Sequence, residues 1–185
     1  MKLIDMRFDE NMVKDWIRKE FTQFRSDPFD FTNSVTQIVG LYINGSVFSI
    51  TNIQETVDYF GNKEDIAVCR LKETENSAIQ SAFKNSEMIS TPIGGRIDYI
   101  TVVNEHQKVK NLKDDYEVWL TRGIIFSVDG REISFEKDNV PFSEEIIIRR
   151  GYNLLEKFTD VNDFLEGWEK GILAECHREV IEMKN

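Results

Sequence analysis

Hydrophobic and polar residues alternate in two stretches of the chain, residues 39–50 ("VGLYINGSVFSI") and residues 123–137 ("GIIFSVDGREISFEK"). Alternation with a period of two predicts β-strands that bury one face. The dipeptides Asn44-Gly45 and Asp129-Gly130 lie inside these stretches. Such dipeptides favour type I′ turns, because both central residues of these turns need positive φ. The sequence therefore predicts two β-hairpins.

Each predicted hairpin carries facing apolar residues at the same distance from its turn. A two-residue turn makes Leu41 face Phe48 in the first hairpin and makes Phe126 face Ile133 in the second. Cross-strand pairs of aliphatic and aromatic residues stabilise two-stranded ribbons. The turn chemistry and the pairing explain these residue types without any functional role.

A further apolar strand follows each hairpin, "EDIAVCRL" in the first case and "SEEIIIRRG" in the second. The chain thus contains two similar hairpin-plus-strand units, residues 35–71 and 118–151. Two interpretations remain open: the units derive from an internal duplication, or they are independent solutions of the same hairpin problem. Two copies are too few for a solenoid, which needs about three repeats.

Helical spacing of apolar residues occurs at both ends of the chain. Near the N-terminus, residues 9–27 predict an amphipathic helix that Asp9 caps, and the Asp27-Pro28 dipeptide ends it. Near the C-terminus, residues 152–183 predict one helix or two. The apolar positions are Met12, Val13, Trp16, Ile17, Phe21 and Phe24 in the first segment, and Val161, Phe164, Leu165, Trp168, Ile172 and Cys176 in the second.

These elements predict an α+β fold. We expect a mainly antiparallel sheet, curved or closed into a partial barrel, with amphipathic helices at the N- and C-termini packed against it. The length of 185 residues suggests one domain spanning residues 1–185. A chain of this length buries enough surface to fold without a disulfide or a metal.

The formal net charge of −10 narrows the possible partners. Nucleic-acid binding depends on clustered Lys and Arg, so we expect no nucleic-acid partner. An acidic surface would speed the approach of a basic protein partner. The same charge is also explained by solubility alone.

The two cysteines and two histidines give no metal or nucleophile motif. Cys69 and Cys176 are far apart in sequence, and neither belongs to a CxxC unit. Neighbouring residues of a helix point about 100° apart, so His177 is badly placed to activate Cys176. The chain shows no apolar run long enough for a secretory signal or a membrane span. We therefore predict a cytoplasmic protein with reduced thiols, no membrane association and no cofactor.

Glycines and carboxylates give no catalytic pattern either. Gly94-Gly95 lacks the spacing of nucleotide-binding loops and is better explained by a turn. Adjacent strand residues face opposite sides, so neither Glu64-Asp65 nor Glu144-Glu145 forms an acid–base pair. The Arg149-Arg150 doublet is expected to pair with nearby glutamates. We assign no catalytic, cofactor-binding or metal-binding residue from the sequence.

The leading hypothesis is a non-enzymatic protein that binds another protein, of the inhibitor or immunity type. Its contact residues would be the exposed acids Asp114, Asp115, Glu144 and Glu145. The alternative is a small-ligand-binding protein or a metal-dependent hydrolase with a site between the sheet and the terminal helices. A deep pocket with convergent polar groups and shifted pKa values would favour the alternative.

Overall fold

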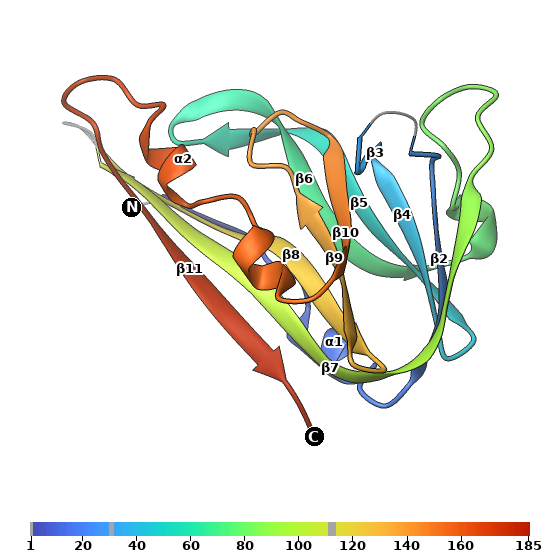
Figure 1. Cartoon of the computed structure of the whole chain (residues 1–185). Helices are drawn as coiled ribbons and strands as arrows, with labels where there is room; N and C mark the ends of the chain where they lie inside the picture. Colours follow the sequence, from blue (N-terminus) through green and yellow to red (C-terminus); the bar gives the residue numbers. More distant parts are fainter. Residues whose placement is uncertain (1, 30–31, 111–113) are drawn as a thin grey trace.

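Within residues 2–29, 32–110 and 114–185, which the computed structural model describes, antiparallel sheet predominates (Figure 1). Strands make up 61% of the described residues and helices 9%. The strands are β1 (Lys2–Met6), β2 (Glu20–Ser26), β3 (Ser34–Thr36), β4 (Ile38–Ile43), β5 (Ser46–Tyr59), β6 (Asn62–Thr74), β7 (Ile89–Lys110), β8 (Asp115–Val128), β9 (Arg131–Lys137), β10 (Glu145–Gly151) and β11 (Leu173–Met183). The helical segments are α1 (Glu10–Lys14), η1 (Asn76–Ala78), η2 (Leu154–Lys157) and α2 (Asn162–Leu165).

The described strands form one open, 11-stranded sheet in the order β3-β10-β9-β8-β7-β2-β4-β5-β6, with β1 beside β8 and β11 beside β7. The long strand β7 belongs to both halves of this sheet. Its residues 89–96 pair with β2, and its residues 97–110 pair with β8. β7 bends strongly between these parts, so the two halves of the sheet turn toward each other (Figure 1).

Gln37 joins these two halves at a second place. It is the single residue between β3 and β4, which lie far apart in the strand order, and its φ is 66°. Its N–H donates to the carbonyl of Glu144, and its carbonyl accepts from the N–H of Asn52. The short link therefore connects the start of β10 to β5.

Both predicted hairpins are confirmed. Asn44 and Gly45 have φ values of 52° and 82°, and Asp129 and Gly130 have values of 50° and 75°, as type I′ turns require. Leu41 faces Phe48, and Phe126 faces Ile133. Each hairpin continues into a third antiparallel strand, which gives the meanders β4-β5-β6 and β8-β9-β10. An internal duplication of residues 35–71 and 118–151 stays a prediction.

The predicted α+β fold is wrong, because neither end of the chain folds as a long helix. At the N-terminal end only α1 is helical, and Asp9 caps it by accepting from the N–H of Asn11 at 2.9 Å. Residues 20–26 form β2 instead of continuing this helix. The Asp9 cap was predicted correctly, but the length of the helix was not.

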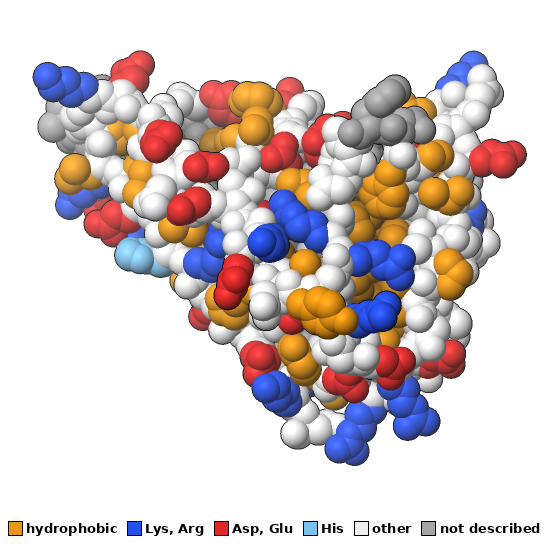
Figure 2. All heavy atoms as spheres, in the orientation of Figure 1, with side chains coloured by type: hydrophobic (Ala, Val, Ile, Leu, Met, Phe, Trp, Pro, Cys, Tyr) orange, Lys and Arg blue, Asp and Glu red, His pale blue; other side chains and the backbone are white. Residues whose placement is uncertain are grey.

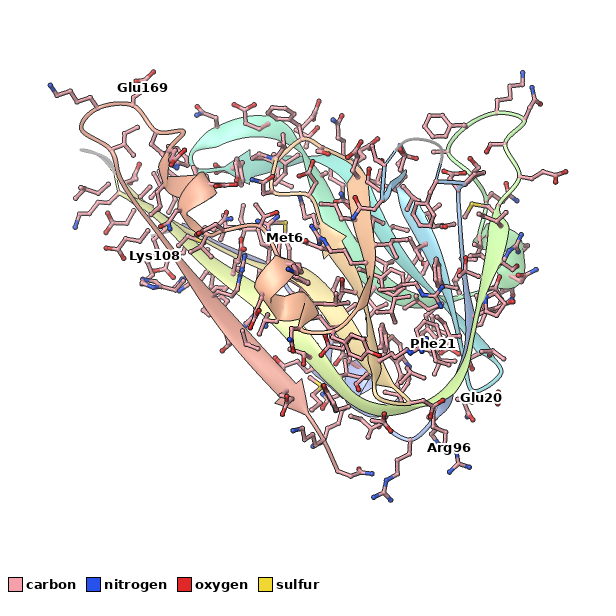
Figure 3. The ribbon with its side chains drawn as sticks, viewed as in Figure 1. Met6, Glu20, Phe21, Arg96, Lys108 and Glu169 are labelled. Carbon is pink, nitrogen blue, oxygen red and sulfur yellow. The ribbon has the colours of Figure 1, made fainter. Side chains whose placement is uncertain are left out.

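A β-bulge explains why β2 resembled a helix in the sequence. The register of β2 shifts between Phe21 and Gln23 against both of its neighbours. An extra residue changes which side chains share a face, so Phe21 and Phe24 are both fully buried although they are three residues apart. Figure 3 shows Phe21 inside the bend of the sheet and Glu20 at its outer side. Three-residue spacing on one face is the signal that predicts a helix.

The predicted C-terminal helix is also replaced, mostly by a strand. α2 contains four residues, and Gly171, with φ of 100°, precedes β11. β11 pairs with β7 over its whole length, from Leu173 opposite Lys110 to Met183 opposite Ile100. Extended backbone in this segment satisfies an edge of β7 that a helix would leave unpaired. Phe164, Trp168 and Ile172 still pack together against Phe60 and its neighbours, as their apolar spacing suggested.

Aromatic rings fill the space enclosed by the bent sheet. The ring centroids of Trp16, just after α1, and Phe48 lie 4.7 Å apart, and those of Phe21 and Phe126 lie 4.9 Å apart. The ring centroids of Phe126 and Phe135 lie 6.1 Å apart, and the two ring planes are nearly perpendicular. Offset and edge-to-face contacts of this kind add to the stabilisation from burial. Among the described residues no helix combines the length and the apolar character needed to cross a membrane.

We expect the Phe126→Ala substitution to lower the free energy of unfolding by about 3–5 kcal/mol, because it removes a fully buried ring from the centre of this cluster. The matched control is Phe142→Ala, since Phe142 is 63% exposed. This control should change stability by less than about 0.5 kcal/mol. Urea unfolding followed by tryptophan fluorescence measures both, and equal losses would contradict the assignment of the core.

Candidate functional site

The four acids predicted to contact a partner lie in two separate places. Asp114 and Asp115 are exposed at the start of β8. Glu144 is half-buried and accepts from the amide of Gln37 at 2.7 Å and from the N–H of Gln54 at 2.8 Å. Glu145 accepts from the hydroxyl of Ser34 at 3.0 Å. Glu144 therefore holds the sheet together, and partner binding by these acids stays a prediction.

The cysteines are buried, and the histidines lie opposite each other on β7 and β11, His106 against His177. Cys69 and Cys176 are free and buried, and burial raises the pKa of each thiol to about 12. Cys176 and His177 are adjacent in β11, one buried and the other exposed. His106 stacks on Trp119 with ring centroids 4.1 Å apart and hydrogen-bonds Glu117 at 2.9 Å. Within the described residues no group of His, Cys, Asp and Glu side chains has the arrangement of a metal site.

A buried ionic cluster joins three strands of the sheet. Glu105 on β7 is 3% exposed and accepts from Arg122 on β8 at 2.6 Å and from Arg178 on β11 at 2.7 Å. Burial alone would raise the pKa of Glu105, but the two guanidinium groups more than offset it and lower the pKa to about 2. Burial opposes the charge on Arg122 as well, and Glu105 keeps its pKa raised. The cluster is therefore charged at neutral pH.

Residues 152–168, which we call the covering segment, lie over this part of the sheet and contain η2 and α2 (Figure 1). Arg178 donates to the carbonyl of Thr159 at 2.6 Å. Glu136, on β9, is fully buried and accepts from the N–H of Thr159 at 2.9 Å and from Arg149. The expected pairing of Arg149 with a glutamate is thus confirmed. Buried charges of the sheet fix the covering segment through its backbone.

A cavity of about 250 Å³ lies between the sheet and the covering segment. Its apolar walls are formed by Tyr59, Pro141, Val161, Phe164 and Trp168, and its polar lining by Glu105, Gln107, Arg122, Asn139, Thr159, Asp160 and Asp163. Several acidic side chains gather over the region of α2 in the space-filling view (Figure 2). The cavity thus combines aromatic walls, a buried ionic floor and exposed acids near its mouth.

Gln107 lies in this floor with an unsatisfied side-chain oxygen. The residue is 3% exposed, and its amide nitrogen donates to Glu105 at 3.3 Å. Its Oε1 atom is buried without a hydrogen-bond partner, and so is the Nε atom of Arg122. A buried acceptor without a partner costs about 1–3 kcal/mol. Unsatisfied groups that line a cavity are natural contacts for a bound molecule.

Lys137, the last residue of β9, lines a smaller space beside this cavity. It is 6% exposed, and its ammonium group donates to the carbonyl of Asp138 at 3.1 Å. Burial and then the positive charge of Arg122 lower the pKa of Lys137 to about 8. Met6, labelled in Figure 3, lines the same space from β1.

The sequence analysis did not identify this cluster, for two physical reasons. In the register of β8 against β7, Gly123 lies opposite Val103 and Thr121 lies opposite Asn104, so Arg122 is an extra residue without an opposite partner. The alternation of side chains along a strand does not predict which way such a residue points. Arg178 had been placed in the predicted C-terminal helix. The available signal was an arginine inside the apolar run "WLTRGIIF" of β8.

No protein-family model, curated protein or solved structure matches this chain. The site is therefore interpreted from its own geometry.

We expect the Glu105→Gln substitution to lower the free energy of unfolding by about 3–5 kcal/mol, because it leaves two guanidinium groups without their carboxylate. Glu55→Gln is the matched control. Glu55 pairs with Arg70 at 2.7 Å, but both side chains are exposed, so the loss should stay below about 1 kcal/mol.

The pH dependence provides a second measurement for the same variant. The pKa of Glu105 is lower in the folded protein than in the unfolded chain, so its contribution is complete above about pH 4.3 and is lost as the pH falls toward 2. The stability difference between the wild type and Glu105→Gln should therefore shrink in that window. A constant difference between pH 6 and pH 3 would contradict the charged cluster.

Lys137→Met should change the alkaline stability profile. The folded pKa of Lys137, about 8, lies below the unfolded value of about 10.4, so between these values the unfolded chain binds the extra proton and stability rises with pH. We expect Lys137→Met to have a higher free energy of unfolding than the wild type at pH 8, and this difference should decrease by about 2–3 kcal/mol from pH 8 to pH 10.5. Urea titrations of both proteins measure this difference. The contributions of the other titrating groups, which both proteins share, cancel in it. An unchanged advantage across the range would show that the buried amine has an ordinary pKa.

Proposed function

We propose that this chain binds a small organic molecule in the cavity between the sheet and the covering segment. The observation that carries the proposal is an aromatic cavity lined by Gln107, a residue whose Oε1 atom is buried without a hydrogen-bond partner. Ligand sites are typically concave and mostly apolar, with a few polar groups that fix orientation. Strongly shifted pKa values at Glu105 and Lys137 lie at the same place.

The cavity favours a neutral ligand of modest size. A volume of about 250 Å³ is slightly below the roughly 300–1,000 Å³ of typical ligand pockets. Three carboxylates, Glu105, Asp160 and Asp163, line it against one guanidinium, Arg122. This acidic excess would repel an anionic ligand but would not repel a neutral one. Tyr59, Phe164 and Trp168 suit a flat apolar body.

The Oε1 atom of Gln107 requires a hydrogen-bond donor on the ligand. An amide, an amine or a hydroxyl group meets this requirement. A ligand of this class would satisfy the buried acceptor, and its apolar part would displace water from the aromatic walls. Orientation would then come from one polar end, and affinity mostly from the apolar body.

We also propose a cytoplasmic location for the protein. Cys69 and Cys176 are both free, as is usual for thiols in a reducing compartment.

Binding should be detectable with a set of substituted benzamides and benzyl alcohols, which carry a flat ring and a donor. Gln107→Leu should weaken the best of these about 3–10-fold, because one hydrogen bond is lost. The same substitution should leave the free protein as stable as the wild type or more stable, since it removes an unsatisfied buried oxygen. Ligand-observed NMR gives the affinities, and urea unfolding gives the stability.

Trp168→Ala should reduce the same affinities by about tenfold or more, because an aromatic wall of the cavity is removed. Trp119→Ala is the matched control, since Trp119 stacks on His106 and does not line the cavity. Binding that is unchanged in both Gln107→Leu and Trp168→Ala would contradict the proposed site. Absence of binding throughout the compound set would contradict the proposed ligand class.

A further inference from the structure

Lys137 is a buried lysine with an unusual set of neighbours. Lysine is rarely buried without an ion pair, because removing an ammonium group from water is costly. In the described part of the chain no carboxylate lies within salt-bridge distance of its Nζ atom, whose hydrogen-bond acceptor is the carbonyl of Asp138. Asp138 and Glu105 favour the charged form from a greater distance, but burial and the charge of Arg122 outweigh them.

A second cation shares the same acceptor. The Nη1 atom of Arg122 donates to the carbonyl of Asp138 at 2.9 Å and to that of Lys137 at 3.2 Å. Two positive groups thus converge on one carbonyl oxygen, and the carboxylate of Glu105 is already bound by Arg122 and Arg178. Repulsion and burial both favour a neutral amine at Lys137, and its pKa is lowered to about 8.

Lys137 lines a smaller space beside the proposed ligand cavity. The space that Lys137 lines has a volume of about 20 Å³. It is bounded by Tyr59, Gln107, Arg122, Asn139, Pro141 and Phe164, all of which also line the cavity of about 250 Å³. The small space is too small for a second molecule. A ligand whose body occupies the larger cavity could extend one small group toward Lys137.

We propose that Lys137 captures a carbonyl group of the ligand as a reversible imine. This inference rests on the proposed function and assigns the ligand to the aldehydes or ketones with a flat, neutral body. A neutral lysine amine in a desolvated pocket is the nucleophile that this chemistry requires. Surface lysines, with a pKa of about 10.4, have a much smaller neutral fraction than Lys137 near pH 8 and react more slowly.

The reaction balances without any further reagent. The lone pair of Nζ forms a bond to the carbonyl carbon, the carbonyl π electrons move to oxygen, and a proton passes from nitrogen to that oxygen. Nitrogen then expels the hydroxyl group, which takes up a proton and leaves as water, and the remaining nitrogen proton is released as the C=N bond forms. Tyr59 lines both spaces, and its hydroxyl stays protonated because burial raises its pKa. It can donate the proton to the departing oxygen and regain one from nitrogen.

The charge of Arg122 also determines which product forms. A guanidinium close to Nζ disfavours a protonated iminium, so the product is the neutral imine. Imine formation is reversible, because water can add back to the C=N bond. The proposal thus describes covalent but reversible binding.

The test uses the full chain and benzaldehyde as the probe. After a set incubation at each pH, sodium borohydride reduces the neutral imine to a stable secondary amine and consumes the remaining aldehyde. Intact-mass analysis followed by peptide mapping should find one dominant adduct, on Lys137. At pH 8 the neutral fraction of Lys137 exceeds that of an ordinary lysine by roughly 100-fold. We therefore expect labelling at least about tenfold faster than at Lys108, whose side chain is 42% exposed, with a rate that levels off above about pH 8.

Two variants keep the test decisive. Lys137→Arg retains the charge and Lys137→Met removes it, and either should abolish the dominant adduct while labelling of Lys108 continues. Circular dichroism identifies whichever variant is folded. Labelling of surface lysines without Lys137, or a rate at Lys137 that keeps rising to pH 10, would overturn the proposal.

The outcomes also separate this inference from the proposed function. Benzamide binding without any adduct at Lys137 would reject the imine and retain the ligand cavity. Selective labelling of Lys137 by acetaldehyde, without benzamide binding and with no effect of Trp168→Ala, would retain the reactive amine and reject the aromatic ligand. Selective labelling by benzaldehyde that Trp168→Ala slows would support both.

Discussion

The pairing of Glu105 with Arg122 and Arg178 is the interaction on which the functional half of the molecule depends. Three strands each contribute one of these side chains, the consecutive strands β7 and β8 and the distant β11, and all three charges are largely removed from water. None of the three can be buried alone at acceptable cost. β7, β8 and β11 must therefore pack in one relative arrangement, and the covering segment is attached to that arrangement through Thr159.

The same cluster makes an apolar cavity with a polar floor possible. A sheet face covered only by aliphatic side chains would pack closely against residues 152–168 and leave no space. Here the covering segment is attached by hydrogen bonds at Leu154 and Thr159, and aromatic rings surround the remaining gap. Gln107 and Lys137 then face a space in which their polar atoms are only partly satisfied. Polar atoms that lack some of their hydrogen bonds lower local stability, and such sites are common where proteins bind ligands.

Sequence patterns predicted the parts of the fold that depend on local chemistry. The two hairpins followed from Asn-Gly and Asp-Gly, because positive φ at consecutive positions is a requirement of the turn itself. The Asp9 cap followed in the same way. The helices were mistaken because burial in β2 repeats every three residues across a bulge, and nothing in the sequence marks that bulge. Such errors arise where pairing with distant strands overrides the local period.

The candidate site was less predictable than the fold for a related reason. Arg122 is placed by a register shift between β7 and β8, and Arg178 by the pairing of β11 with β7. The first depends on a bulge that local alternation does not reveal, and the second depends on a strand distant in sequence. The hypothesis of acidic contact residues used exposure and charge, which composition supplies. A buried cluster of one carboxylate and two guanidinium groups leaves little trace in a composition with 23 Lys and Arg and 33 Asp and Glu residues.

The parallel pairing of β1 with β8 has a consequence for how the chain acquires this structure. Residues 2–6 find their partners at residues 116–120, after more than half of the chain has been synthesised. β2 likewise pairs with β7, which is synthesised later. Contacts between such distant segments carry a high loop-closure cost and make folding slow compared with helical proteins of equal size. During synthesis the emerging N-terminal strands carry unsatisfied edges and exposed aromatic side chains, so this architecture depends on protection from association until its C-terminal half emerges.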